Sequence, residues 1–190
     1  MSELSVGSLS GLAANSYVIS VAPGSSITGT GVGGFTASAT ITATDASWAV
    51  PTLGSSVVKV TAIGGGGGGG GAFSTVNNGG TGGTTTFNAG GAGTVTATGG
   101  SGGRHANQNV AGLTGSAGSS VGNGGQAGIW ANNSQTGTEG NGGFITVSYL
   151  DLTGISTVNV TIGAGGAGGT GSSNGGAGGR GEVIVEYVAG

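Results

Sequence analysis

Short runs of alternating apolar and polar residues occur in this chain, and each run has the length of a β-strand. Valine, isoleucine and threonine dominate the runs, which suits a pleated surface that is buried on one side. No segment shows the apolar stripe of an amphipathic helix, and glycine disfavours a helix by about 1 kcal/mol per residue relative to alanine. The pattern therefore predicts an all-β fold with small, sandwich-like sheets. The expected strands lie at 16–21, 36–42, 46–51, 57–63, 143–149, 156–162 and 181–188.

These runs and the glycine-rich stretches between them divide the chain into two expected units. Residues 1–35 are expected to form a small N-terminal β unit that serves in attachment or oligomerisation. Residues 36–190 are expected to form a glycine-rich β domain, with strands near 36–63 and again toward its end. Its glycine-rich segments occupy 64–142 and 163–181. We expect the flanking strands to hold these segments in register.

Glycine dominates the composition, with 51 of 190 residues, and only 5% of the residues are charged. Flexible, disordered tracts and a lattice of packed backbone both fit such a chain. Disordered chains usually avoid apolar residues and carry a high net charge, whereas this chain is 35% hydrophobic with a formal net charge of −3. The composition therefore favours an ordered protein that buries its alternating runs.

Many glycines recur at every third position of the glycine-rich stretches. Polyproline II has three residues per turn, so this spacing leaves one edge of a segment without side chains. Neighbouring segments can then approach closely and hydrogen-bond to one another, as buried backbone requires. Two prolines are too few for collagen, so the spacing predicts a bundle of short polyglycine-II-like segments. Two of these sets are Gly163, Gly166 and Gly169, and Gly175, Gly178 and Gly181.

Residues that carry chemistry are few and scattered. The basic residues are Lys59, Arg104 and Arg180, which fall short of the charge that a nucleic-acid binder needs. No apolar run approaches the roughly 18 residues of a membrane helix, so we expect no membrane insertion. The chain has no cysteine and one histidine, and its acidic residues are dispersed. Glu182 and Glu186 share one face of an expected strand, which we interpret as a solvated sheet edge.

One stretch matches a dinucleotide-binding fingerprint. Gly163–Gly168 follows an apolar run and satisfies G-x-G-x-x-G. The fingerprint requires a helix after the glycines, because the pyrophosphate binds at the N-terminus of that helix. The residues that follow are mainly glycine and serine and disfavour a helix. We therefore interpret the match as chance and expect no cofactor, no metal and no enzymatic activity.

A combination of motifs extends over residues 36–190. Its members are Trp48-Ala49-Val50-Pro51, Val58-Lys59-Val60, the glycine run 64–71, Val158–Gly163 and Val183-Ile184-Val185. This combination resembles the glycine-rich C-terminal domain of bacteriophage tail fibre and tail-tip proteins. The chain departs from a full-length fibre in being short and in lacking a long shaft.

The resemblance implies a non-enzymatic, adhesin-like component of the virion surface that is made in the host cytoplasm. Its expected partners are a host receptor, either a glycan or an outer-membrane protein, and other virion proteins. It also implies a homotrimer, for which strand edges at 16–21 and 181–188 are the expected contacts between chains. A capsid decoration or head-fibre protein with no receptor role is the alternative. An ice-binding polyglycine-II protein is a third possibility.

Two islands of larger side chains interrupt the glycine-rich segments, at 104–109 and 129–135. Their aromatic, asparagine and glutamine residues suit a carbohydrate or protein surface, since they combine apolar faces with amide groups. A structural alternative is that Trp130 closes the edge of the bundle and the polar residues are ordinary loop. The candidate receptor-binding residues are Arg104, His105, Asn107, Trp130, Asn132 and Asn133.

Overall fold

The computed structural model describes residues 35–71, 77–105, 112–113, 121–123, 129–130, 138–171 and 173–190. Within them the fold is all-β, as the alternating pattern predicts, with one short 3-10 helix, η1 (Gly90–Ala92). Two four-stranded antiparallel sheets have the strand orders β1-β10-β3-β8 and β2-β9-β4-β5, and β6 pairs with β7 separately. The strands are β1 (Ala37–Ile41), β2 (Asp45–Ala49), β3 (Val57–Ile63), β4 (Thr85–Asn88), β5 (Thr94–Ala97), β6 (Gly112–Leu113), β7 (Ile129–Trp130), β8 (Ile145–Asp151), β9 (Thr157–Thr161) and β10 (Glu182–Tyr187).

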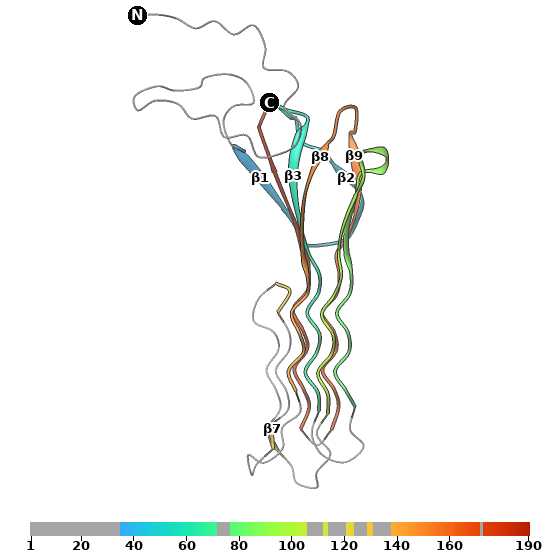
Figure 1. The fold of residues 1–190 in the computed structure, drawn as a ribbon, viewed down its shortest axis with the longest axis vertical. Helices are drawn as coiled ribbons and strands as arrows, with labels where there is room; N and C mark the ends of the chain where they lie inside the picture. The colour runs from blue at the N-terminus through green and yellow to red at the C-terminus, as the bar shows by residue number, and fades with distance from the viewer. Residues whose placement is uncertain are drawn as a thin grey trace, which may run out of the picture.

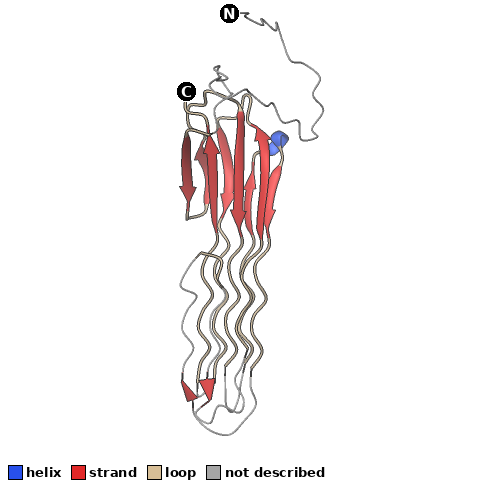
Figure 2. Cartoon of the chain, turned by 60° about the vertical axis from the view of Figure 1, so that its left-hand side comes forward, coloured by secondary structure: helices blue, strands red, loops and turns tan. Residues whose placement is uncertain are grey.

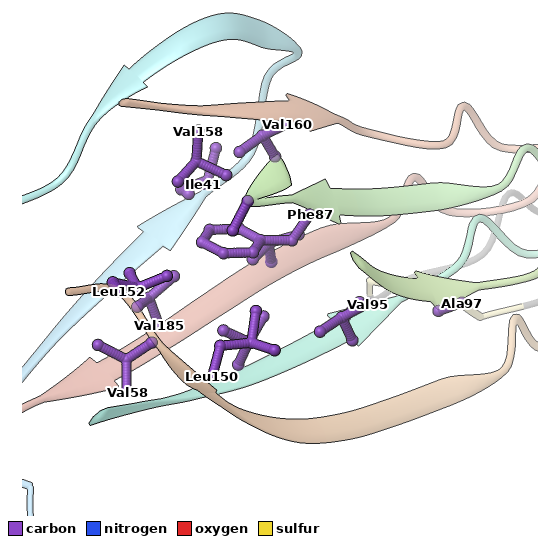
Figure 3. Packing of buried hydrophobic residues seen from close by; sticks show 14 residues of the cluster. Ile41, Val58, Phe87, Val95, Ala97, Leu150, Leu152, Val158, Val160 and Val185 are labelled. Carbon is purple, nitrogen blue, oxygen red and sulfur yellow. The ribbon is translucent and has the colours of Figure 1, made fainter. Parts of the chain in front are cut away.

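The two four-stranded sheets face each other and enclose the apolar core (Figure 3). In β3, Val58, Val60 and Ala62 are fully buried and alternate with more exposed residues, so one face of the strand points inward. Phe87 of β4 fills the space between the sheets, and the ring of Trp48 meets it edge to face at 6.0 Å. Trp48 therefore belongs to the periphery of the core.

Most strands lie within two residues of their expected positions, but the sequence pattern did not reveal β4 and β5. Both lie inside the stretch 64–142, where threonine, asparagine and glycine surround their few apolar residues. Phe87 and Val95 are nevertheless fully buried in these strands. Four-residue strands give too short an alternation to stand out from such surroundings.

The interpretation of Glu182 and Glu186 as a solvated sheet edge is wrong. Their strand, β10, lies inside its sheet and pairs with β1 on one side and β3 on the other. Glu186 lies opposite Lys59 of β3 and forms an ion pair with it. Consequently β10 has no free edge for contacts between chains, and the expected contact region at 16–21 lies outside the described residues.

Below the sandwich, the strands continue into extended glycine-rich segments that run side by side (Figures 1 and 2). The segment 64–71 continues β3 and is hereafter the central segment; its glycines are all buried. The other segments, hereafter the ring segments, are 77–84, 98–105, 138–144, 163–171 and 173–181, which adjoin β4, β5, β8, β9 and β10. The sandwich strands thus set the order and direction of the segments below them.

The amides of the central segment donate to three neighbours in strict rotation. Gly65 and Gly68 donate to the carbonyls of Gly83 and Gly80, respectively. The amide of the residue that follows each of them donates to the ring segment 173–181. The third amide in each cycle donates to 138–144, and the N–O distances of the whole set lie between 2.8 and 3.2 Å. Hydrogen bonding therefore repeats every three residues here, in contrast to the period of two in the sandwich strands.

Carbonyls of the central segment accept hydrogen bonds from two further ring segments. The Gly65 carbonyl accepts from the Gly100 amide, and the Gly66 carbonyl accepts from the Gly166 amide. The ring segments also bond to one another, and Gly122 and Asn123 bond to the ring segments 138–144 and 173–181. Because an unmade buried backbone hydrogen bond costs about 1–3 kcal/mol, this mutual pairing is what lets so much bare backbone be buried.

Close contact between segments requires glycine at the inward positions. A Cβ atom at Gly68 would overlap the carbonyl oxygen of Ala167, and one at Gly66 would overlap that of Asn123. Stacked sheets usually lie about 10 Å apart because side chains fill the gap, whereas hydrogen-bonded neighbours lie within about 5 Å. Removing the side chains therefore merges the two layers of the sandwich into one hydrogen-bonded bundle.

Outward positions of the ring segments carry the side chains, again at every third residue. In 163–171 the buried residues are Gly163, Gly166 and Gly169, and the exposed ones are Ala164, Ala167 and Thr170. The other ring segments also expose a side chain at three-residue intervals, for example Thr98, Ser101 and Arg104. The left-handed helical twist implied by the name polyglycine II stays a prediction.

We predict that Gly68→Ala destabilises the protein by about 3 kcal/mol or more, because the new methyl group meets fixed backbone rather than a side chain that can move. Gly142→Ala is the matched control within the bundle, since its Cβ would lie 3.5 Å from the nearest atom, the Gly122 oxygen. The control should stay within about 0.5 kcal/mol of the parent chain. Urea unfolding followed by circular dichroism measures both; equal stabilities would contradict the lattice.

Candidate functional site

The glycine bundle ends far from the sandwich (Figure 1), and polar residues stand at that end of its segments in the sequence. We call this end the tip and define it by its described residues. The tip consists of Asn77, Asn78, Arg104, His105, Thr138, Glu139, Thr170, Gly171, Ser173 and Asn174. The C-terminal residue lies at the opposite end of the molecule, beside the sandwich (Figures 1 and 2).

His105 is held at the tip by the side chain of Asn78. The Asn78 Oδ1 atom accepts a hydrogen bond from the His105 backbone amide at 3.0 Å. The same oxygen lies 2.8 Å from His105 Nδ1. An amide oxygen can only accept, so the Nδ1 atom is the donor in this contact. Both residues are exposed.

Arg104 is fixed by Thr138, which follows it by more than thirty residues in the chain. The Arg104 backbone amide donates to the Thr138 hydroxyl at 2.6 Å, and the Thr138 amide donates to the Arg104 carbonyl at 2.8 Å. These paired bonds fix the backbone of Arg104, and the residue itself is exposed. A guanidinium so placed can donate to carboxylate, phosphate or hydroxyl groups of a partner.

The remaining tip contacts also use asparagine and threonine. Asn77 Nδ2 donates to the Thr170 hydroxyl at 2.9 Å, and the Gly171 amide donates to Asn174 Oδ1 at 3.0 Å. Each contact joins residues on two neighbouring ring segments or on the two sides of a turn. The tip is therefore a polar surface of amides and hydroxyls whose backbone positions are set by the bundle.

The structure brings together part of the candidate set. Arg104 and His105 lie at the tip, and β7, which contains Trp130, lies at the same end of the molecule (Figure 1). The Trp130 backbone pairs with Gly112 of β6. Asn107, Asn132 and Asn133 lie outside the described residues. The roles of all six residues in receptor binding stay predictions.

Sequence reasoning missed Asn77, Asn78, Thr138 and Asn174 as members of this surface. A signal for the asparagines exists in the strings Asn77-Asn78-Gly79-Gly80 and Asn174-Gly175-Gly176, where an asparagine precedes a restarting glycine repeat. Such an asparagine marks the point where the chain has turned at the tip and enters the bundle again, because asparagine favours turns.

Among the described residues, shallow hollows occur at the sandwich end. One is lined by Leu53, Leu152 and Ile155 together with neighbouring loop residues. Near it, hydrogen bonds from the Thr153 hydroxyl, Ser56 and the Thr153 amide lower the pKa of the Asp151 carboxyl. The two bonds from Thr153 lie within the turn that follows β8, so Asp151 stabilises that turn.

The described residues also bear on metal sites and membrane spans. Among them, no group of three or more histidine, cysteine, aspartate or glutamate side chains is placed to hold a metal ion. No helix in the described part of the chain is long and apolar enough to span a membrane. Comparisons with protein-family models, curated proteins and solved structures gave no match to this chain.

We predict that Asn78→Ala loosens the tip locally while the bundle stays folded. The His105 amide loses its acceptor, which costs about 0.5–1.5 kcal/mol, so its hydrogen exchange should accelerate about two- to tenfold. Thr81→Ala is the matched control, because Thr81 is exposed one repeat farther from the tip on the same ring segment. Equal exchange of His105 in the two variants would show that Asn78 does not hold it.

Proposed function

We propose that this protein is a bacteriophage virion component of a fibre or tail tip, which binds the host cell surface through residues displayed at the tip of its glycine bundle. The proposal rests first on the motifs at 36–190 that resemble tail fibre and tail-tip proteins. Its partners would be a host glycan or outer-membrane protein and other virion proteins, and its location would be the virion surface.

One structural observation supports the proposal: Arg104 and His105, which are candidate residues chosen from sequence, lie at the end of an elongated, hydrogen-bonded bundle (Figure 1). Arg104 and His105 are exposed there, and their backbone amides donate to the side chains of Thr138 and Asn78 on neighbouring segments. The sandwich and the C-terminal residue lie at the other end (Figure 1). A rod with an attachment end and a polar display end has the geometry that an adhesin requires.

The residue types at the tip favour a polar ligand. Asparagine, threonine, histidine and arginine offer donors and acceptors that match hydroxyl groups, and hydrogen bonds to neighbouring segments hold their backbone. A preorganised surface loses less conformational entropy on binding, which favours affinity. Recognition by such residues is non-covalent, so the proposal assigns no enzymatic step and no cofactor, and a homotrimeric assembly remains part of it.

Binding of the labelled protein to a panel of bacterial strains tests this function. We predict that Arg104→Ala combined with Trp130→Ala lowers cell binding at least tenfold while circular dichroism stays unchanged. Arg180→Ala is the control, because Arg180 is also exposed but lies beside Thr42 at the sandwich end of the bundle. Flow cytometry measures bound protein per cell.

Two results would overturn the proposal. Equal cell binding by the double variant and the Arg180→Ala control would remove the tip as the receptor site. Binding to no strain, together with saturable binding to phage heads that lack this protein, would favour the capsid-decoration alternative.

A further inference from the structure

The large apolar side chains that are most exposed gather on one face of the sandwich. Val57, Phe144, Ile145, Val147 and Tyr149 are the exposed large hydrophobic residues of the described chain, with exposures between 43% and 65%. Ile145, Val147 and Tyr149 share one face of β8, and we call these three residues the β8 stripe. An apolar cluster of this kind on a polar protein is typical of a surface that a further segment of the chain, a partner or a ligand covers.

The β8 stripe occupies an outer face beside a sheet edge. Ile145, Val147 and Tyr149 alternate with Thr146, Ser148 and Leu150, and Leu150 is buried in the core. The Thr146 hydroxyl donates to the Thr96 carbonyl of the facing sheet, so this alternate set points inward. In the described residues β8 is the last strand of its sheet, with β3 as its one neighbour. The stripe therefore points away from the sandwich.

The chain that precedes β1 reaches this same face. The ring of Phe35, the first described residue, stacks on the ring of Tyr149 with centroids 6.2 Å apart. β1 and β8 lie at opposite edges of their sheet, so Phe35 extends over the outer face to make this contact. The residues before Phe35 are thereby connected to one end of the stripe.

Within those preceding residues, one run has the pattern that would cover the stripe. In Ser16–Val21, the side chains of Tyr17, Ile19 and Val21 alternate with smaller or polar neighbours, which is the two-residue period of the stripe. Residues 22–34 link this run to Phe35 and span at most about 3.3–3.6 Å each. That length reaches every residue of β8, which has seven residues.

We propose that residues 16–21 of the same chain dock on the β8 stripe, with Tyr17, Ile19 and Val21 against it. This assigns the N-terminal unit an intramolecular partner in place of a contact between chains. It also places that unit on the sandwich, at the far end of the molecule from the tip. The proposal stands on the exposed stripe and the Phe35 contact and does not depend on receptor binding.

Thiol labelling tests the coverage of the stripe, because the natural chain has no cysteine. In full-length protein carrying Val147→Cys, the thiol should react at least tenfold more slowly with a maleimide than the thiol of Asn159→Cys. Asn159 is exposed on β9 of the other sheet. Adding Ile19→Asp to the Val147→Cys chain should restore fast labelling, whereas adding Ser20→Asp, on the opposite face of the run, should not.

Disulfide formation then distinguishes the same chain from a second copy. Val147→Cys is paired in turn with Tyr17→Cys, Ile19→Cys and Val21→Cys under mild oxidation. At least one pair should form a disulfide within a single chain, seen on a non-reducing gel as monomer, and pairs with Asn159→Cys should not. Disulfides between chains, with labelling that accelerates on dilution, would assign the stripe to a second copy and overturn the proposal. Labelling of Val147→Cys as fast as Asn159→Cys would overturn it as well.

Discussion

Direct hydrogen bonding between backbones that carry no inward side chains is the interaction on which the elongated half of this protein depends. The central segment donates in rotation to three neighbours and is buried along its whole length. Glycine loses more conformational freedom on folding than any other residue, so such a bundle is costly to order. The sandwich offsets this cost, because each glycine-rich segment adjoins a sandwich strand that fixes where the segment begins and in which direction it runs.

This constraint divides the positions of the glycine-rich segments into inward positions, which pack, and outward positions, which carry side chains. Inward positions are restricted to glycine by contact with neighbouring carbonyl groups, as at Gly66 and Gly68. Outward positions, one residue in three, can vary without disturbing the hydrogen bonds. Residues at the ends of the segments therefore have fixed backbone positions, and Arg104 and His105 are exposed in this way. A scaffold of this kind lets the exposed side chains change while the fold stays the same.

The alternating pattern of neighbouring residues was sufficient to predict those strands that have a clear alternation of their own. The alternation at Val57–Ile63 predicted β3 with its observed bounds. It did not reveal β4, because Phe87 stands among threonine, asparagine and glycine. The three-residue glycine spacing indicated close packing, but which segment lies at the centre depends on contacts across the whole chain. For the same reason the island at Arg104 was found, whereas its partner Thr138 was not.

Amide hydrogen exchange across Gly64–Gly71 tests the central claim most directly, because every amide in this segment donates to a neighbouring segment. The account predicts that these amides exchange as slowly as those of β3, which continues into the segment from the core of the sandwich. Exchange of Gly64–Gly71 at the rate of an unstructured glycine peptide, with β3 still protected, would show that the sandwich folds without a bundle and would contradict the account.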